Sequence, residues 1–362
     1  MVKRVTLRTI AKLAGCSTAT VSTVLNGAHG NTKVGDALGE NIMSIARRLK
    51  YCPNTVSRNL RLGRSRTLGV YVQPNLWHGL GYIYEMSIFH GIEEEALARG
   101  YDLLVLNISS QNLPDVCAQR LHEGRIDGVV LLHCSPGEWL DELLKTSQDV
   151  VALDFPESYE GLNVVSLDNV EGVRLGLSKL IEFGHRRIGW AGCVLENDDE
   201  DAMERLEAFR RLSREMGCDV DEDLFFDYWH CSEKIQRSEQ YCQKGGRLAM
   251  RYFMKQSRPP TAVLCQNWLI EMAMCREAET NGWRVPQDLS LVGFDHYEMD
   301  EFFSSPMTAI DHRLHDMGKL AVSGLIDRLE NPAGDTPSFK LKIEPGFCPG
   351  TTIGPPRKGA PH

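Results

Sequence analysis

Apolar residues recur at helical spacing in two short segments near the N-terminus, which predicts two helices that each bury one face. Gly15 supplies the turn between them. Ser17 is a natural N-cap for the second helix because its hydroxyl can accept a hydrogen bond from the first helical turn. Asn26-Gly27 ends that helix. This arrangement predicts a helix-turn-helix. The apolar positions of the two faces are Ile10, Leu13 and Ala14, then Val21, Val24 and Leu25.

The outer face of the second helix carries small polar or methyl-bearing side chains, and no residue from 17 to 27 is charged. Such a face fits against base edges in a DNA major groove, where threonine and alanine methyls can meet thymine methyls. The alternative is a helical hairpin whose outer face is only solvated. The side chains on this face are Thr18, Ala19, Ser22 and Thr23.

A third amphipathic helix is predicted where Leu38, Ile42, Ile45 and Leu49 repeat at helical spacing, and it closes a small three-helix core. Beyond a break at residues 51–54, a short helix is predicted over 55–62. Eight residues are too few for a stable isolated helix, so we expect this segment to order on contact.

From Thr67 the pattern changes to short apolar strands that alternate with amphipathic helices. One series of strands occupies 68–72, 102–107, 127–132 and 149–153, and a second occupies 187–192, 224–228, 262–265 and 289–294. Alternation of this length predicts doubly wound parallel sheets, and two series predict two such subdomains. A ligand is expected in the crevice at the carboxyl ends of their strands.

Charge is segregated along the 362 residues. Residues 1–66 contain twelve Lys or Arg and two Asp or Glu, which gives a net charge of +10. Because the whole chain has a net charge of −9, residues 67–362 carry −19. A basic head on an acidic body favours phosphate binding by the head.

The eleven cysteines are scattered and form no CxxC pair, which excludes a disulfide framework and a zinc ribbon. No apolar run approaches membrane-spanning length, and the N-terminus has no signal-peptide pattern. We therefore expect a cytoplasmic protein that does not enter a membrane. Nothing in the sequence predicts a cofactor or a metal site.

Taken in order, several motifs resemble those of the LacI/GalR family of bacterial transcription regulators. The segment from Val5 to Asn26 is close to the family's helix-turn-helix signature, and 51–60 resembles its hinge helix. Landmarks of the family's core follow in the right order: Gly91-Ile-Glu, Gly100-Tyr-Asp, Arg125-Ile-Asp-Gly-Val, Gly184-His-Arg-Arg-Ile, Arg284-Val-Pro and Val292-Gly-Phe-Asp295.

The resemblance implies a homodimer whose second helices enter successive major grooves of a palindromic operator. It also implies that Leu60 of each hinge helix wedges into the minor groove. The alternative for Leu60 is an apolar contact with the core domain. The resulting DNA-binding set is Thr18, Ala19, Ser22, Thr23, Lys33, Arg58, Leu60 and Arg61. Because Thr23 stands where members often have an arginine, the operator sequence cannot be transferred.

In the core, the resemblance implies a small effector bound between the subdomains. Arg205 matches the family's cleft arginine, and the alternative is a solvated helix residue. Asp295 ends a strand on the crevice side, or caps the next helix. Trp268 stacks on an effector or belongs to the core. The full set of candidates is Trp77, His78, Tyr82, Asp154, Arg205, Asn267, Trp268 and Asp295.

No enzyme is expected, because the chain has no HExxH, GxSxG or GxxxxGK[ST] motif, and Tyr84 stands where a dinucleotide fingerprint needs glycine. We expect an effector-responsive repressor of carbohydrate-metabolism genes. The alternative is the solute-binding protein of a transporter, which would use the same two-lobed core.

The expected architecture is an all-α three-helix head with a hinge helix, followed by an α/β core of two doubly wound subdomains that is periplasmic-binding-protein-like. The expected boundaries are 1–52 for the helix-turn-helix domain, 53–66 for the hinge helix and linker, 67–354 for the core and 355–362 for a disordered tail. Within the core, we expect 67–166 plus 311–331 in the N-subdomain and 167–310 plus 332–354 in the C-subdomain.

Overall fold

The computed structural model describes residues 5–26, 34–51, 64–72, 83–132, 134–192, 200–227, 241–295, 306–331 and 337–357. The chain forms two compact units, Met1–Ser65 and Arg66–His362, and each is described by itself. Among the described residues, no helix combines the length and apolarity needed to cross a membrane.

In its described residues, the first unit forms helices α1 (Leu7–Ala14), α2 (Thr18–Asn26) and α3 (Asp36–Arg48). Gly15 ends α1 in the left-handed region with φ 67°, which a glycine adopts without a steric penalty. The Ser17 hydroxyl accepts a hydrogen bond from the Thr20 amide at 3.0 Å and so caps α2. The turn and the cap expected for the helix-turn-helix are therefore both present.

The core of this unit is small, and only part of the expected apolar face reaches it. Its buried residues are Ile10, Ala11, Val21, Ile42, Ile45 and Ala46. The expectation for Leu13 was wrong, because its side chain is 53% exposed. The buried stripe of α1 runs through positions 7, 10, 11 and 14 instead, and Leu13 lies to one side of it.

The second unit contains two six-stranded sheets. The first has the order β11-β5-β4-β3-β1-β2 and is parallel throughout. Its strands are β1 (Thr67–Val72), β2 (Asp102–Val105), β3 (Gly128–Leu132), β4 (Val150–Leu153), β5 (Asn163–Leu167) and β11 (Lys340–Ile343).

The second sheet repeats this topology in the order β12-β10-β9-β8-β6-β7, and only β12 runs antiparallel to its neighbour. Its strands are β6 (Ile188–Ala191), β7 (Phe225–Phe226), β8 (Ala262–Cys265), β9 (Ser290–Phe294), β10 (Ala309–Asp311) and β12 (Gly346–Cys348). The two doubly wound parallel sheets expected from the strand–helix alternation are thus present.

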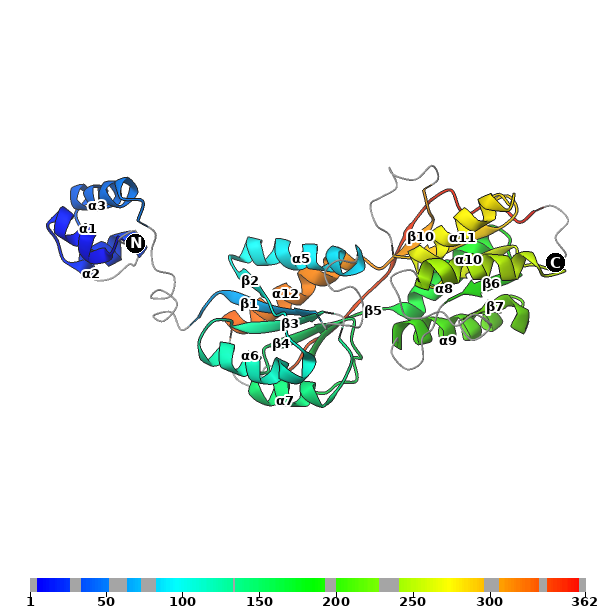
Figure 1. The fold of residues 1–362 in the computed structure, drawn as a ribbon, viewed down its shortest axis with the longest axis horizontal. Helices are drawn as coiled ribbons and strands as arrows, with labels where there is room; N and C mark the ends of the chain where they lie inside the picture. Colours follow the sequence, from blue (N-terminus) through cyan, green and yellow to red (C-terminus); the bar gives the residue numbers. More distant parts are fainter. Residues whose placement is uncertain are drawn as a thin grey trace. The chain divides into compact units, whose positions relative to one another are not determined.

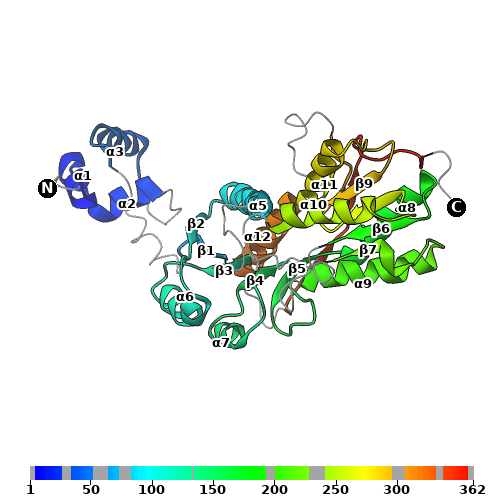
Figure 2. The same ribbon diagram turned by 45° about the vertical axis from the view of Figure 1, so that its right-hand side comes forward.

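Helices cover both faces of each sheet, which explains why inner strands such as β3, β4, β6 and β8 are buried and apolar. On the first sheet, α5 (Ile83–Arg99) and α12 (Leu314–Glu330) lie on one face, and α6 (Leu113–His122) and α7 (Glu138–Thr146) lie on the other (Figure 1). On the second, α8 (Asn169–Glu182) and α9 (Glu200–Glu215) lie opposite α10 (Tyr241–Met254) and α11 (Trp268–Thr280) (Figure 2). Two short 3-10 turns complete the unit, Ser110–Asn112 and Glu222–Leu224.

The chain passes three times between the two sheets: after β5, after β10 and after β11. The third passage corrects the expectation that all of 332–354 lies in the C-subdomain, because β11 pairs with β5 in the first sheet. A lysine-rich strand, Lys340-Leu-Lys-Ile, carries too weak an apolar signal to be assigned to a sheet from its pattern alone.

The expected disorder of 355–362 is also wrong for its first three residues. Pro356 lies beside Gly184, and the Arg357 guanidinium carbon lies 5.8 Å from the ring centroid of Trp283. This cation–π contact holds the segment against the second subdomain. Residues 358–362 lie outside the described part of the chain.

Helices α5 and α12 approach each other so closely that backbone meets backbone. A Cβ atom on Gly91 would overlap the carbonyl oxygen of His315, and one on Gly318 would overlap that of Ile88. The two glycines therefore set the distance between the helices. This packing fixes which side chains of α5 and α12 stand next to one another at the surface.

Substituting Gly91 tests this contact. Gly91→Ala should destabilise the core by about 3 kcal/mol, because the added methyl group forces two packed backbones apart. The melting temperature, followed by circular dichroism, should fall by several degrees. Gly39→Ala is the matched control, since Gly39 is also helical but has nothing within 4 Å of its added Cβ. That control should be neutral or stabilising, and an equal loss in both variants would contradict the close approach.

Candidate functional site

The exposed face of α2 is the candidate DNA-reading surface. Thr18 and Ala19 are exposed, whereas Ser22 and Thr23 are half-buried. The Thr23 hydroxyl donates to the Ala19 carbonyl oxygen at 3.1 Å. Because this bond engages the hydroxyl within the helix, Thr23 presents its methyl group rather than a hydrogen-bond donor. Four further DNA-binding candidates lie outside the described residues: Lys33, Arg58, Leu60 and Arg61.

In the second unit, polar side chains gather where the strands end. Asp154 follows β4, Gln266 follows β8, Asp295 follows β9 and His312 follows β10. The carboxyl ends of parallel strands share one edge of each sheet, which is where doubly wound folds bind ligands. Gln266, Asp295 and His312 are also buried, and Asp154 is half-buried, so the partners of these polar groups are decisive for stability.

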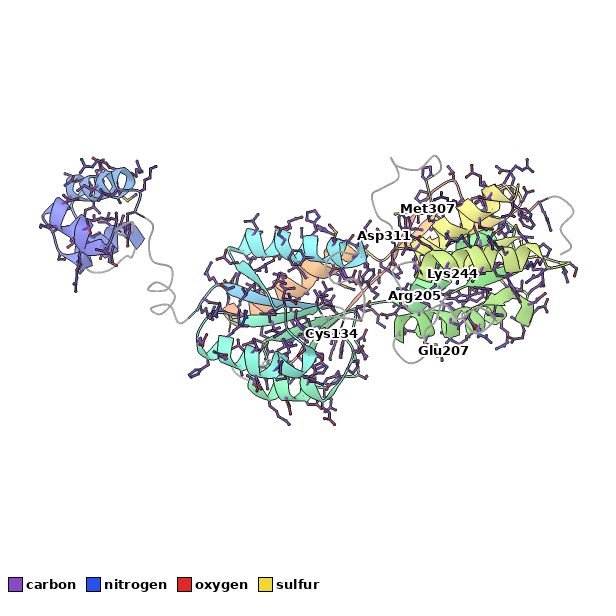
Figure 3. The ribbon with its side chains drawn as sticks, viewed as in Figure 1. Cys134, Arg205, Glu207, Lys244, Met307 and Asp311 are labelled. Carbon is purple, nitrogen blue, oxygen red and sulfur yellow. The ribbon has the colours of Figure 1, made fainter. Side chains whose placement is uncertain are left out.

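Arg205 is the centre of this group. It is 6% exposed and belongs to α9, whereas Glu207 two residues later points away from the sheet (Figure 3). Its Nε donates to Asn169 Oδ1 at 2.7 Å, and its Nη1 donates to the Gln266 carbonyl oxygen at 2.9 Å. Its Cζ lies 4.8 Å from the ring centroid of Phe294. Arg205 is therefore a buried, positioned guanidinium and not a solvated helix residue.

Nearby carboxylates stabilise the positive charge of Arg205. Burial alone lowers the pKa of Arg205, but the nearby Asp295 and Asp201 outweigh it and the net pKa is raised. His312 responds in the opposite sense, because burial and the Arg205 charge lower its pKa. A neutral His312 has one ring proton, and the 2.8 Å contact between its Nδ1 and Asp295 Oδ1 assigns that proton to Nδ1.

A second group of acids links the two subdomains. The Tyr84 hydroxyl on α5 donates to Asp154 Oδ2 at 2.6 Å. The Asp154 and Asp201 carboxyls are hydrogen-bonded to each other, and Asn169 Nδ2 donates to Asp201 Oδ1 at 2.7 Å. Burial raises the pKa of both Asp154 and Asp201, and the Asp154 charge raises that of Asp201 further. The pair therefore takes up a shared proton at a higher pH than an ordinary aspartate does.

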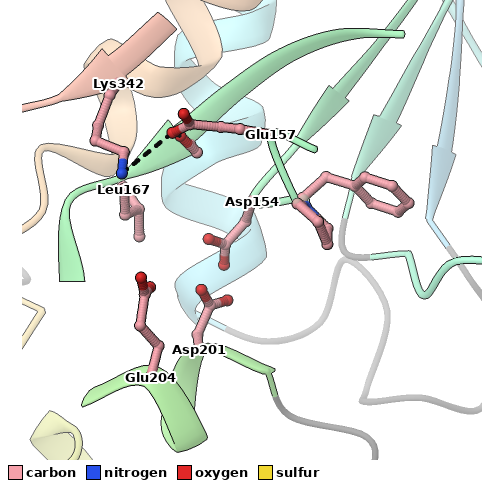
Figure 4. A pocket seen from close by; sticks show the side chains of 9 residues that line it. Asp154, Glu157, Leu167, Asp201, Glu204 and Lys342 are labelled. Carbon is pink, nitrogen blue, oxygen red and sulfur yellow. Dashed lines mark hydrogen bonds and ion pairs between the residues drawn. The ribbon is translucent and has the colours of Figure 1, made fainter. Parts of the chain in front are cut away.

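A pocket of about 370 Å³ opens beside this pair (Figure 4). The Asp154 and Asp201 carboxyls point toward each other, and Glu204 lies next to Asp201. Lys342 of β11 lies 3.3 Å from Glu157 on the opposite wall. The lining residues come from both subdomains: Asp154, Phe155, Pro156, Glu157, Ser166, Leu167, Asp201, Glu204 and Lys342. The pocket is thus dominated by carboxylates.

Among the effector candidates that the structure describes, only Asp154 lines this pocket. Asn267 caps α11 by accepting from the Ile270 amide at 3.0 Å, so its side-chain oxygen already has a partner. Trp268 is 8% exposed and packs into the apolar core between sheet, α5 and α12, which is the alternative left open by the sequence. Trp77, His78 and Tyr82 lie outside the described residues.

Several residues of the site are missing from the sequence-based set: Tyr84, Asn169, Asp201, Glu204, Gln266, His312 and Lys342. One signal was available, because Asp201 precedes Arg205 by four residues and so shares its helical face. The others are single polar residues in separate segments, and only the three-dimensional fold brings them together.

Comparison with known proteins identifies both parts of the chain. The profile described as bacterial regulatory proteins, lacI family, matches residues 6–54, and that of a periplasmic binding protein-like domain matches 177–353. The chain belongs to the lacI family of bacterial regulatory proteins. Members of the lacI family are regulators and not enzymes, which confirms that expectation.

Relatives within the lacI family align along nearly the whole chain. The HTH-type transcriptional repressor PurR of Vibrio parahaemolyticus serotype O3:K6 is 29% identical over 345 residues, which cover 94% of this chain and 96% of that protein. PurR of Vibrio atlanticus is 27% identical over 346 residues, with the same shares covered.

Solved structures confirm the expected fold. A complex of the transcriptional regulator CelR with cellobiose matches with a TM-score of 0.64 and 26% identity, covering 97% of this chain and all of that one. The Lac repressor dimer bound to operator and the anti-inducer ONPF matches with a TM-score of 0.77 and 20% identity, covering 97% and 99%. The head followed by two parallel-sheet subdomains is thus shared with this lacI-family architecture.

The proton shared by Asp154 and Asp201 predicts a pH effect. A raised pKa means that the folded chain binds this proton more tightly than the unfolded chain, so stability falls as pH rises above about 4, the ordinary value for aspartate. Asp201→Asn keeps a polar partner for Asp154 but cannot ionise. Its melting temperature should exceed that of the natural chain by several degrees near pH 8 and by less near pH 5.

The control for this pH series is Glu207→Gln, which removes an exposed carboxylate from the same helix. Differential scanning calorimetry should show no comparable pH-dependent gain for that variant. A constant offset between Asp201→Asn and the natural chain at every pH would mean that no proton is shared.

Proposed function

We propose that this chain is a repressor of transcription that binds a palindromic DNA operator and releases or retains it in response to a small effector. The observation that carries the proposal is the pairing of an uncharged, exposed recognition face on α2 with an acid-lined pocket in the second unit. The names of the aligned relatives, transcriptional repressors, support the repressor role.

Each part of the α2 face has a proposed task. Thr18, Ala19 and Thr23 read base edges, the last through its methyl group, and Ser22 contacts a phosphate. Lys33, Arg58 and Arg61 add phosphate contacts, and Leu60 wedges into the minor groove. A single three-helix head spans only one half-site, so we infer that two copies of the chain act as a homodimer on two half-sites.

The effector is proposed to be a neutral, hydroxyl-rich molecule such as a sugar. Asp154, Glu157, Asp201 and Glu204 offer acceptors for sugar hydroxyls, whereas Lys342 is the single basic residue among the nine that line the pocket. Four carboxyls repel phosphate or carboxylate groups, even with one proton shared. The similar regulator CelR, which was solved with cellobiose, supports this class.

This effector class links the chain to genes for carbohydrate uptake or use, and such a protein acts in the cytoplasm, where DNA and imported sugar meet. Arg205 is proposed to hold Asn169 and Gln266 in place around the ligand. Together with Asp295, it is proposed to change the arrangement of the strand ends when the ligand binds. Asn267 and Trp268 are proposed to shape the wall next to the pocket, and Trp77, His78 and Tyr82 to contribute from the segment that follows β1 in the sequence.

DNA binding should depend on the α2 face. The full-length chain, presented with a pool of random duplexes, should select a palindrome and bind it with an affinity that falls steeply as salt rises. Ala19→Glu should weaken operator binding at least a hundredfold in a gel-shift titration, because it places a charge against base edges while keeping a good helix former.

Met43→Glu adds the same charge to the exposed surface of α3 and is the matched control. It should alter operator binding far less than Ala19→Glu. Equal losses of operator affinity in the two variants would mean that net charge alone, and not the α2 face, determines binding. Selection of a DNA sequence without two-fold symmetry would contradict the homodimer.

The acidic pocket should bind neutral ligands more tightly than anionic ones. When neutral mono- and disaccharides are titrated calorimetrically, at least one should bind, and it should bind more tightly than its phosphorylated form. Purine bases should not compete with that sugar. Glu204→Gln should weaken that ligand about tenfold, which corresponds to one charge-assisted hydrogen bond of about 1.4 kcal/mol.

Glu207→Gln, on the same helix but facing solvent, should bind the sugar normally. Preferential binding of sugar phosphates would overturn the proposed effector class while leaving the DNA-binding role intact. Binding of sugar with no change in operator affinity would instead favour a role in solute capture.

A further inference from the structure

The close approach of α5 and α12 places three metal-ligating side chains together, none of which lines the acid-lined pocket. His90 and Glu94 lie one helical turn apart on α5, so both project from the same side. His315 lies in the first turn of α12, next to the point where Gly91 and Gly318 bring the two backbones into contact. This packing fixes the positions from which all three side chains extend.

The ligand atoms are already close. One nitrogen or oxygen from each of the three residues lies within 4.8 Å of the others. His315 Nε2 is 2.9 Å from Glu94 Oε2, and the rings of His90 and His315 meet edge to face with centroids 5.0 Å apart. Binding a zinc ion requires these three atoms to move to about 2.0–2.2 Å from a common point. His90 and Glu94 are exposed and His315 is half-buried, so an ion can enter from solvent.

Two imidazoles and one carboxylate form a donor set that suits Zn²⁺. Three protein ligands leave a fourth tetrahedral position for water. Calcium and magnesium prefer oxygen ligands throughout, so the two histidines select against them.

Neighbouring charges complete the environment. Lys319 Nζ donates to Glu94 Oε1 at 2.7 Å, which fixes the orientation of the carboxylate. An ion bound by Glu94 Oε2 and His315 Nε2 would replace the hydrogen bond between these two atoms. The Lys319 ammonium opposes a nearby cation, whereas Asp316 Oδ1, 3.9 Å from His315 Nδ1, favours one.

We propose that His90, Glu94 and His315 bind one divalent transition-metal ion per chain, with Zn²⁺ the best match. The site joins α5 to α12 and is independent of the proposed effector. The sequence gives no motif for it, because His315 lies 221 residues after Glu94. This site departs from the sequence-based expectation of no metal.

Zinc binding to the full-length chain can be measured by isothermal titration calorimetry, with ZnCl₂ as the probe. The natural chain should bind one equivalent of Zn²⁺. His90→Gln and His315→Gln should each weaken that binding at least tenfold, and Lys319→Gln should strengthen it several-fold because it removes the opposing charge while keeping a hydrogen-bond donor. Zinc should raise the melting temperature of the natural chain but not of the histidine variants.

His122→Gln removes an exposed histidine of α6 and is the control, which should bind zinc like the natural chain. Co²⁺ supplies a second readout: a tetrahedral visible spectrum without a thiolate charge-transfer band supports the site, whereas a thiolate band assigns the ion to cysteine and overturns it. Absence of stoichiometric binding, or equal affinity in the natural chain and His315→Gln, also overturns it.

Discussion

The buried guanidinium of Arg205 imposes the arrangement around it. A charge removed from water is tolerated only where hydrogen bonds and opposite charges replace its hydration. Asn169 and the Gln266 carbonyl supply hydrogen bonds, and Asp295 and Asp201 supply charge. These partners come from α8, the end of β8, the end of β9 and α9, so a single side chain fixes how four segments meet at one edge of the second sheet.

The same constraint explains the chemistry of the pocket. More carboxyls surround Arg205 than one positive charge can balance, and the excess is relieved when Asp154 and Asp201 share a proton. That shared hydrogen bond also crosses from the first subdomain to the second. A ligand whose hydroxyls compete for these carboxyls therefore changes the contact between subdomains. A ligand shifts the equilibrium between two arrangements of the subdomains only when it binds one of them more tightly. The Asp154–Asp201 contact is where the affinities for the two arrangements would differ.

Local signals in the sequence predicted much of the fold. Gly15 and Ser17 define the turn and cap of the helix-turn-helix by backbone chemistry alone, and apolar runs flanked by amphipathic helices define the sheets. Prediction failed where the determinant is long-range. The exposure of Leu13 depends on how small the three-helix core is, and the sheet that β11 joins depends on pairing with β5. Likewise, Tyr84 and His312 reach the site only through contacts with residues that are distant in the sequence, Asp154 and Asp295 respectively.

The segregation of charge, +10 in residues 1–66 and −19 in the rest, bears on what an effector must accomplish. Phosphates attract the head and repel the acidic remainder, so non-specific DNA binding rests on the head alone. Specific binding typically exceeds non-specific binding by about 4–10 kcal/mol, whereas coupling between two sites is typically about 1–3 kcal/mol. An effector of that strength cannot remove such a protein from DNA. It changes the affinity for the operator about 5- to 150-fold and leaves the electrostatic attraction of the head in place, so regulation redistributes the protein along DNA rather than freeing it.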